Sequence, residues 1–101
     1  MDALQILVGL IIKKAEIIQD YFQLIFPKGT ILNIYNKYQY DGGSVLALKG
    51  KKLVSVMETN NQIVLDFEDS GKLTVGLLDE DYSGPEALEL IQEGKPPVVW
   101  Q

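Results

Sequence analysis

The hydrophobic positions of this chain recur at an interval of 41 residues. Shifting the sequence by that interval places Gly9 on Gly50 and Phe22 on Ile63. Further apolar pairs coincide in the same register: Ile12 with Leu53, Leu24 with Leu65, Phe26 with Phe67, Leu32 with Leu73, and Ile34 with Val75. The pattern predicts two pseudo-repeats, over about residues 6–36 and 47–77.

The second repeat has the pattern of three β-strands. Residues 53–57 are β-branched and apolar, as strands prefer, and Asn60-Asn61 suits a tight hairpin turn. Apolar and polar residues then alternate over 63–67 and again over 73–77. This period of two predicts strands with one buried face.

The first repeat is ambiguous at its start. Strands are expected over residues 22–26 and 30–35, on either side of a turn that contains Pro and Gly. The repeat register carries the first strand back to about residues 6–15. The same N-terminal stretch also has helical spacing, so a helix covering part of residues 2–18 remains the alternative.

The segments outside the repeats are shorter. Residues 36–44 are polar and aromatic and predict a loop, followed by a short strand over 45–48. A capping-box spacing and a proline in the first turn predict a C-terminal helix over about 84–93. Residues 98–100 predict a terminal edge strand, because the preceding prolines are tolerated there.

These elements predict a mainly β (β-rich α+β) chain that forms one domain over residues 1–101. Two antiparallel three-stranded meanders are expected to form a sandwich or a half-open barrel, with one C-terminal helix beside them. The apolar fraction of 47% in 101 residues is sufficient for one packed core.

The composition argues against catalysis. The chain has no Cys, no His and no Arg. It therefore lacks the commonest general base and metal ligand, and also the residue best suited to bidentate phosphate recognition. An EF-hand-like start at Asp79 fails because Leu90 stands where a bidentate Glu belongs. We expect a protein that is not an enzyme and uses neither a cofactor nor a metal.

Charge is unevenly distributed along the chain, whose net charge is −5. Residues 1–55 hold seven Lys and four acidic residues, whereas residues 56–101 hold two Lys and ten acidic residues. The second part predicts a strongly negative surface. Such a surface repels nucleic acid and attracts basic proteins.

The acidic tract near residue 80 is the main candidate for a binding surface. Tyr82 lies within the tract and would supply the aromatic anchor that interface hot spots favour. The complete candidate partner-binding set is Asp79, Glu80, Asp81, Tyr82, Glu86, Glu68, Asp69 and Tyr40. The alternative is an ordinary solvated surface, with acidic residues favourably placed at a helix N-terminus.

The hydrophobic stretch at the N-terminus is too short to cross a bilayer as a helix. It carries Asp2 where a signal peptide has basic residues, and no small-residue cleavage site follows it. We expect a soluble, cytoplasmic protein with no membrane partner.

Four short patterns in this sequence resemble small bacterial proteins encoded beside toxins. They are Leu48-x-Gly50-Lys51-x-Leu53-x-Ser55-Val56, Ile63-x-Leu65-x-Phe67-Glu68-Asp69, Gly71-x-Leu73-x-Val75 and Asp81-x-x-Gly84-Pro85-Glu86-Ala87. Over about Leu7 to Trp100 the chain is similar to immunity proteins of contact-dependent growth inhibition and polymorphic toxin systems. The resemblance implies a cytoplasmic inhibitor of one cognate toxin domain, often a nuclease. It implies no particular binding residue, because that group of proteins has no common binding motif.

Charge and resemblance together predict an immunity protein that covers the active-site cleft of a basic toxin, a ribonuclease, with its acidic surface. Electrostatic complementarity of this kind speeds encounter and selects the partner. Two alternatives stay open. One is a non-catalytic structural or adaptor module that self-associates through an edge strand, and the other is a small enzyme that uses carboxylates.

Overall fold

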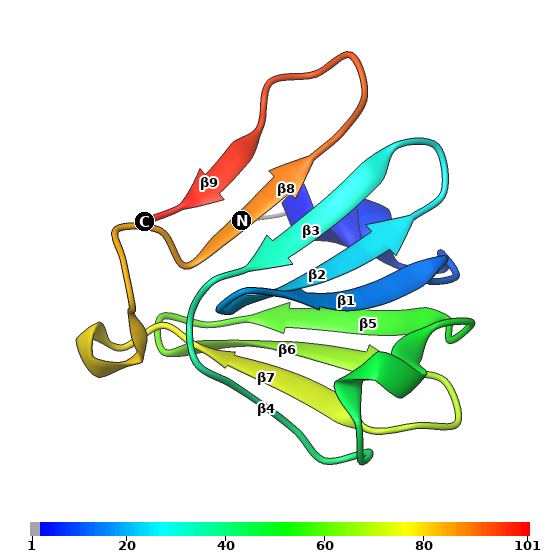
Figure 1. Cartoon of the computed structure of the whole chain (residues 1–101), viewed down its shortest axis with the longest axis horizontal. Coiled ribbons are helices and arrows are strands. Elements are labelled where there is room, and N and C mark those ends of the chain that lie inside the picture. Colours follow the sequence, from blue (N-terminus) through cyan, green and yellow to red (C-terminus); the bar gives the residue numbers. More distant parts are fainter. Residues whose placement is uncertain (1–2) are drawn as a thin grey trace.

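The computed structural model describes residues 3–101, which form nine β-strands in two antiparallel sheets (Figure 1). One sheet contains, in spatial order, β1 (Lys14–Ile18), β2 (Tyr21–Phe26), β3 (Thr30–Ile34), β8 (Leu88–Ile91) and β9 (Val98–Trp100). The other contains β4 (Tyr38–Tyr40), β7 (Lys72–Gly76), β6 (Gln62–Phe67) and β5 (Leu53–Glu58). Three short 3-10 helices are η1 (Ala3–Leu7), η2 (Val45–Leu48) and η3 (Asp79–Asp81). The predicted mainly β fold with two antiparallel sheets is confirmed.

The 41-residue register relates the two halves in space as well as in sequence. Shifted by 41, β2 covers β6 residue for residue, β3 falls within one residue of β7, and η1 covers η2. The turns correspond too, since Lys28 and Asp69 both have positive φ, at 61° and 53°. The two predicted meanders are therefore present, as β1–β2–β3 and β5–β6–β7.

Backbone hydrogen bonds between the two halves follow a pseudo-twofold arrangement. The N–H of Gly9 donates to the carbonyl of Leu53 at 2.7 Å, and the N–H of Gly50 donates to the carbonyl of Ile12 at 2.8 Å. Each of these bonds maps onto the other when the two halves are exchanged. The halves are thus joined as the subunits of a symmetric dimer are joined.

The fourth strand of each sheet comes from the opposite half of the chain. β4 follows the first meander but pairs with β7 of the second, with Tyr38 opposite Val75. β8 follows the second meander but pairs with β3 of the first, with Leu88 opposite Ile34. Neither sheet is complete without a strand from the other half.

One hydrophobic core takes residues from both sheets and from η1 and η2. Inward-facing residues alternate with outward-facing ones along the central strands, as a period of two requires. The buried residues of β2 and β6 are Phe22, Leu24, Phe26, Ile63, Leu65 and Phe67, none more than 2% exposed.

The predicted C-terminal helix over 84–93 is wrong. Its central residues form β8, in which Leu88 and Leu90 are buried while Glu89 is partly exposed. This alternation fits the open edge of β3, and pairing with that edge prevails over local helical spacing. The Ser83 hydroxyl donates to the carbonyl of Tyr35 at 3.1 Å instead of capping a helix. The predicted edge strand over 98–100 is confirmed as β9.

The N-terminal strand predicted over 6–15 is wrong for most of its length, because η1 ends at Leu7 and β1 begins only at Lys14. The strand predicted over 45–48 is likewise a 3-10 helix, η2. Leu4 and Leu7 are fully buried one 3-10 turn apart, which explains the helical spacing of this stretch. Asp2, at the start of the alternative helix, lies outside the described residues. The predicted loop over 36–44 contains β4.

Candidate functional site

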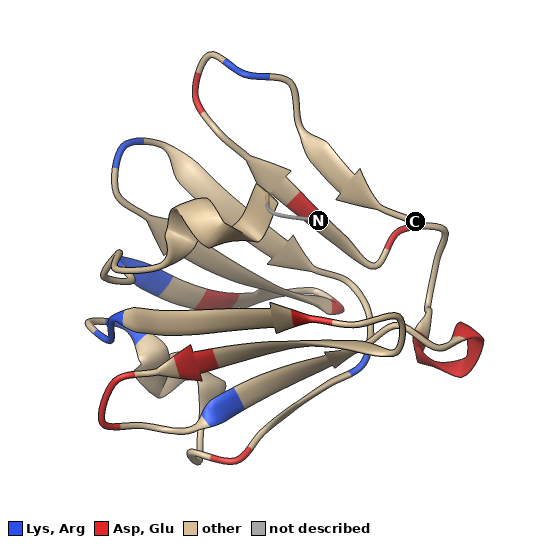
Figure 2. Ribbon diagram, turned by 180° about the vertical axis from the view of Figure 1, so that it is seen from behind, with Lys and Arg blue, Asp and Glu red and all other residues tan. Residues whose placement is uncertain are grey.

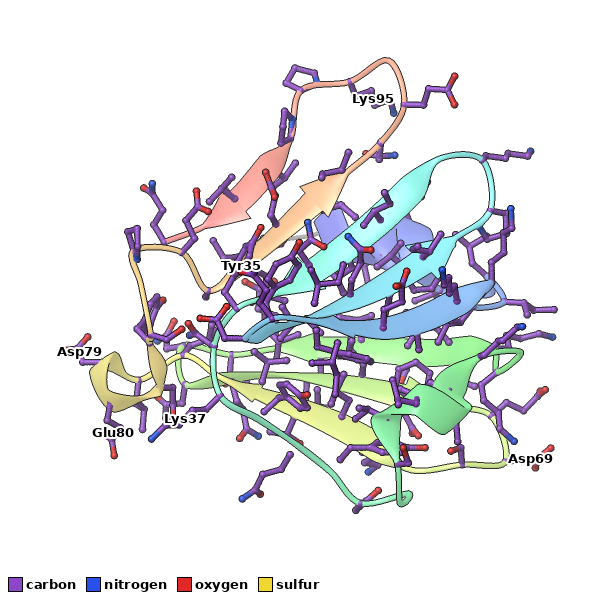
Figure 3. The ribbon with its side chains drawn as sticks, viewed as in Figure 1. Tyr35, Lys37, Asp69, Asp79, Glu80 and Lys95 are labelled. Carbon is purple, nitrogen blue, oxygen red and sulfur yellow. The ribbon has the colours of Figure 1, made fainter. Side chains whose placement is uncertain are left out.

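The structure divides the predicted site residues between two ends of the molecule (Figure 3). Asp79 and Glu80 lie on η3 at one end, whereas Asp69 lies at the tip of the β6–β7 hairpin at the other. Tyr40 belongs with Asp69 and its neighbour Glu68, because its hydroxyl hydrogen-bonds to Ser70 in the same hairpin turn. The predicted set therefore does not form one continuous surface.

The η3 turn is fastened to the rest of the fold through Asp81. The side-chain oxygen Oδ2 of Asp81 accepts from the N–H of Leu78 at 3.1 Å, and its carbonyl accepts from the N–H of Lys37 at 2.9 Å. Asp79 and Glu80 are exposed and make no ion pair within residues 3–101. Asp81 thus positions the turn, and Asp79 and Glu80 present charge to solvent.

The segment that carries η3 is an insertion relative to the chain's own first half. Ile34 and Val75 are equivalent under the 41-residue shift. Leu88 pairs with Ile34 as Tyr38 pairs with Val75, so Tyr38 and Leu88 hold equivalent positions too. Three residues lie between Ile34 and Tyr38 along the chain, whereas twelve lie between Val75 and Leu88. The nine additional residues are not needed to cross between the sheets, because the first half makes that crossing without them.

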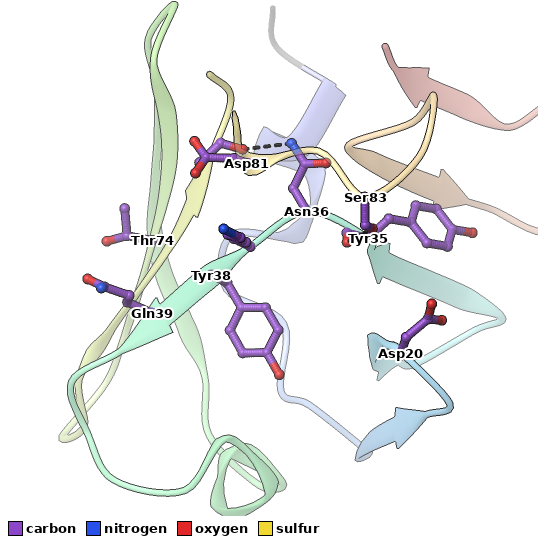
Figure 4. Close-up of a pocket in the computed structure, with 10 residues that line it drawn as sticks. Asp20, Tyr35, Asn36, Tyr38, Gln39, Thr74, Asp81 and Ser83 are labelled. Atoms are coloured by element: carbon purple, nitrogen blue, oxygen red, sulfur yellow. Dashed lines mark hydrogen bonds between the residues drawn. The ribbon is translucent and has the colours of Figure 1, made fainter. Parts of the chain in front are cut away.

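A pocket of about 580 Å³ opens beside η3, where the chain crosses from β3 to β4 (Figure 4). Asn36 lies in this crossing, is only 2% exposed, and donates from Nδ2 to the carbonyl of Gly76 at 2.8 Å. Its Oδ1 has no hydrogen-bond partner among the described residues. The pocket is lined by Asp20, Tyr35, Asn36, Lys37, Tyr38, Gln39, Thr74, Gly76, Asp81 and Ser83.

Tyr35 connects the pocket to the outer face of the five-stranded sheet. Its hydroxyl donates to Oε1 of Glu89 at 2.9 Å. Burial raises the pKa of Tyr35 to about 12, and the hydrogen bond and charge of Glu89, together with the charge of Glu86, act in the same direction. Each of these effects disfavours a second negative charge at this position.

We expect alkaline pH to destabilise the protein through Tyr35. Between about pH 10 and about pH 12 the folded state retains a proton that the unfolded chain releases, so the free energy of unfolding should fall as pH rises through this window. Denaturant unfolding of the wild type and of Tyr35→Phe across this range measures the effect. The difference between the two proteins should shrink with rising pH. A difference that stays constant would contradict the assigned pKa.

Acidic residues from distant parts of the chain gather around the pocket. We call this group, which consists of Asp20, Asp79, Glu80, Asp81, Glu86 and Glu89, the acidic end. Basic and acidic segments are both present toward the opposite end of the molecule (Figure 2). Four lysines belong to the segments around the contacts that join the two halves. They are Lys13, Lys14, Lys51 and Lys52. Lys37 is the basic residue that lines the pocket.

Two residues of the acidic end, Asp20 and Glu89, were absent from the sequence prediction of the binding site, and so was the pocket residue Tyr35. Asp20 has only the signal of a hairpin turn, and Tyr35 only that of a strand end. Glu89 lies within the helix predicted over 84–93, which is not present. The unequal spacing after the two meanders is a sequence signal for this region, but it becomes visible only when the exchanged strands are paired.

Residues 3–101 bring together no group of three or more His, Cys, Asp or Glu side chains that could hold a metal ion. Within the same residues, no helix has the length and apolar character needed to cross a membrane. No protein family, curated protein or solved structure matches the chain.

Proposed function

We propose that this protein is an immunity-type inhibitor that binds a basic toxin domain, a ribonuclease, through its acidic end. The supporting observation is the nine-residue insertion, which places Asp79, Glu80 and Tyr82 beside a pocket in a crossing that the fold makes elsewhere without it. A solvated surface alone does not account for an extra segment that concentrates charge and an aromatic ring at one position.

The acidic end has the electrostatics of such an inhibitor. A ribonuclease cleft is positively charged because it binds phosphates, and carboxylates can occupy the same positions. A negative surface of this kind attracts a basic partner, which raises the association rate. Tyr35 and Tyr82 are half-buried, and rings held in this way lose little entropy when they become interface anchors.

Co-purification followed by an activity assay tests the proposal. The tagged protein is used to capture partners from lysate of the source organism at about 50 mM and about 200 mM salt. We expect one stoichiometric basic protein whose ribonuclease activity falls when the inhibitor is added back in equal amount. Capture of a partner whose nuclease activity is unaffected, or of no partner, would contradict the proposal.

Self-association is a second candidate function, and the edge strand β5 favours it. Val54 and Met57 on this strand are 46% and 64% exposed, and exposed apolar edges can pair with a second chain. Sedimentation across a wide concentration range distinguishes the candidates. We expect a monomer, whereas a stable dimer that is lost in Met57→Lys would support the structural module instead.

A further inference from the structure

A hydrogen-bonded cluster on the outer face of the five-stranded sheet fixes one carboxylate in place. Gln23 Nε2 donates to Oδ1 of Asn33 at 2.8 Å, and Asn33 Nδ2 donates to Oε1 of Glu89 at 3.4 Å. The Tyr35 hydroxyl donates to the same Glu89 oxygen at 2.9 Å. Although Asn33 faces outward, it is only 5% exposed. Glu89 is therefore oriented by two neutral donors, Asn33 and Tyr35, and Gln23 in turn holds Asn33, before any partner arrives.

The Glu89 carboxylate carries its charge without a cation. The ion pair found among the described residues joins Lys14 to Glu16, and no Lys reaches Glu89. Its second oxygen, Oε2, makes no hydrogen bond within residues 3–101. Glu86 adds a further negative charge near Tyr35. The cluster is thus complete on its buried side and lacks a positive partner on its solvent side.

The ring of Tyr35 lies beside this carboxylate and packs against the ring of Tyr21. The rings of Tyr21 and Tyr35 lie 5.1 Å apart at 51°, and Tyr35 itself bonds to Glu89. A guanidinium group is the cation best matched to this arrangement, because it bonds to a carboxylate in its plane and stacks on an aromatic face. An ammonium group gains less from the rings, since it is more strongly hydrated.

The other half of the molecule shows that the fold does not require this cluster. The four-stranded sheet has the same backbone pairing, and its equivalent positions share one core pattern with the first sheet. The cluster is not repeated there. The positions of Tyr21, Gln23, Asn33, Tyr35 and Glu89 are taken, in that order, by Gln62, Val64, Thr74, Gly76 and Gln39. The four-stranded sheet folds without such a cluster, so the cluster of the five-stranded sheet is available for recognition.

We propose that Glu89 and Tyr35 form a receptor for an arginine side chain presented by the protein partner. The identity of the partner rests on the proposed function, but the receptor itself can be tested without any partner. Charge complementarity selects the occupant, because the face offers an oriented anion beside aromatic rings and no cation of its own. Binding would add a buried ionic anchor to the more diffuse attraction of the insertion.

Titration with a small probe tests the receptor. N-acetyl-arginine amide is added to isotopically labelled protein while the side-chain amides of Gln23 and Asn33 are followed by NMR. N-acetyl-citrulline amide, which has the same shape without the charge, is the matched ligand control. Glu89→Gln is the protein variant, because glutamine keeps an acceptor for Tyr35 and Asn33 but removes the charge. Glu93→Gln, at an exposed position after β8, is the matched protein control.

We expect saturable shifts in Gln23 and Asn33 with the arginine probe, at least about tenfold weaker binding of citrulline, and a loss of about tenfold or more in Glu89→Gln. Glu93→Gln should behave as the wild type. Equal shifts with both probes, or no shift with either, would overturn the receptor, and this comparison needs no variant to fold. Capture of a ribonuclease with no arginine shift would leave the proposed function and remove the receptor. An arginine shift with no captured partner would support the receptor and contradict the proposed function.

Discussion

Leu24→Ala and Leu65→Ala are each expected to lower the free energy of unfolding by about 3 kcal/mol. The two residues are equivalent under the 41-residue shift and both are fully buried. Each change removes the same apolar volume from the same core, so the losses should be similar. For a domain of this size, the melting temperature should fall by roughly 15 °C in each variant.

The shape of the transition is as informative as its midpoint. Because β4 and β8 are exchanged between the halves, loss of packing in either half should unfold the whole chain in one step. Calorimetry and denaturant unfolding of both variants measure this. Val54→Ala, at a position 46% exposed, is the control and should change stability by less than about 0.5 kcal/mol. A two-step transition would contradict the exchange of strands.

The double substitution Asp79→Lys and Glu80→Lys is expected to weaken partner binding by on the order of 100-fold at low salt. Both residues are exposed on the insertion, so reversing their charges should leave the fold intact while placing lysines against a basic cleft. Most of the loss should appear in the association rate, because exposed charges act chiefly during encounter. Surface plasmon resonance at several salt concentrations measures both rates.

The matched control is the double substitution Glu68→Lys and Asp69→Lys at the opposite end of the molecule. It changes the net charge by the same amount. Asp69 has φ of 53°, but lysine is tolerated there, because Lys28 holds the equivalent position at 61°. We expect the control to retain binding within about threefold. If both variants lose the same affinity, net charge alone governs binding and the acidic end has no special role.

The strands of the two meanders could be predicted from sequence because their information is local. The alternation over residues 63–67 defines β6, and the repeat transfers the same assignment to β2. The repeat also holds where the predicted element is wrong. Residues 45–48 were predicted as a strand but form the 3-10 helix η2, and the equivalent residues 4–7 of the first copy lie in the 3-10 helix η1.

The exchange of the fourth strands could not be predicted, because it depends on pairing between distant segments. Three residues lie between Ile34 and the fourth strand in the first half, whereas twelve lie between Val75 and the fourth strand in the second, so the 41-residue register is lost. With β8 unrecognised, the capping-box spacing and the proline of this segment predicted a helix. The buried alternation of Leu88 and Leu90 makes sense only beside β3.

The acidic tract could be predicted only in part. Asp79, Glu80, Asp81 and Tyr82 are adjacent in sequence and stay together at η3, and Glu86 lies near Tyr35. Glu68 and Asp69 are separated from them by the length of β7, five residues or roughly 17 Å of extended chain. Residues at the two ends of β7 are close in sequence but lie at opposite ends of the sheet, and this separation appears only in the folded structure.

Hydrogen–deuterium exchange on the purified complex tests the central claim most directly, because it locates the contact surface without any substitution. The account predicts that partner binding slows exchange in residues 77–87 and in the crossing at Tyr35–Lys37, and leaves the β6–β7 hairpin and the segment around Lys51 unchanged. Protection confined to the hairpin at Asp69, or to the edge strand β5, would contradict it.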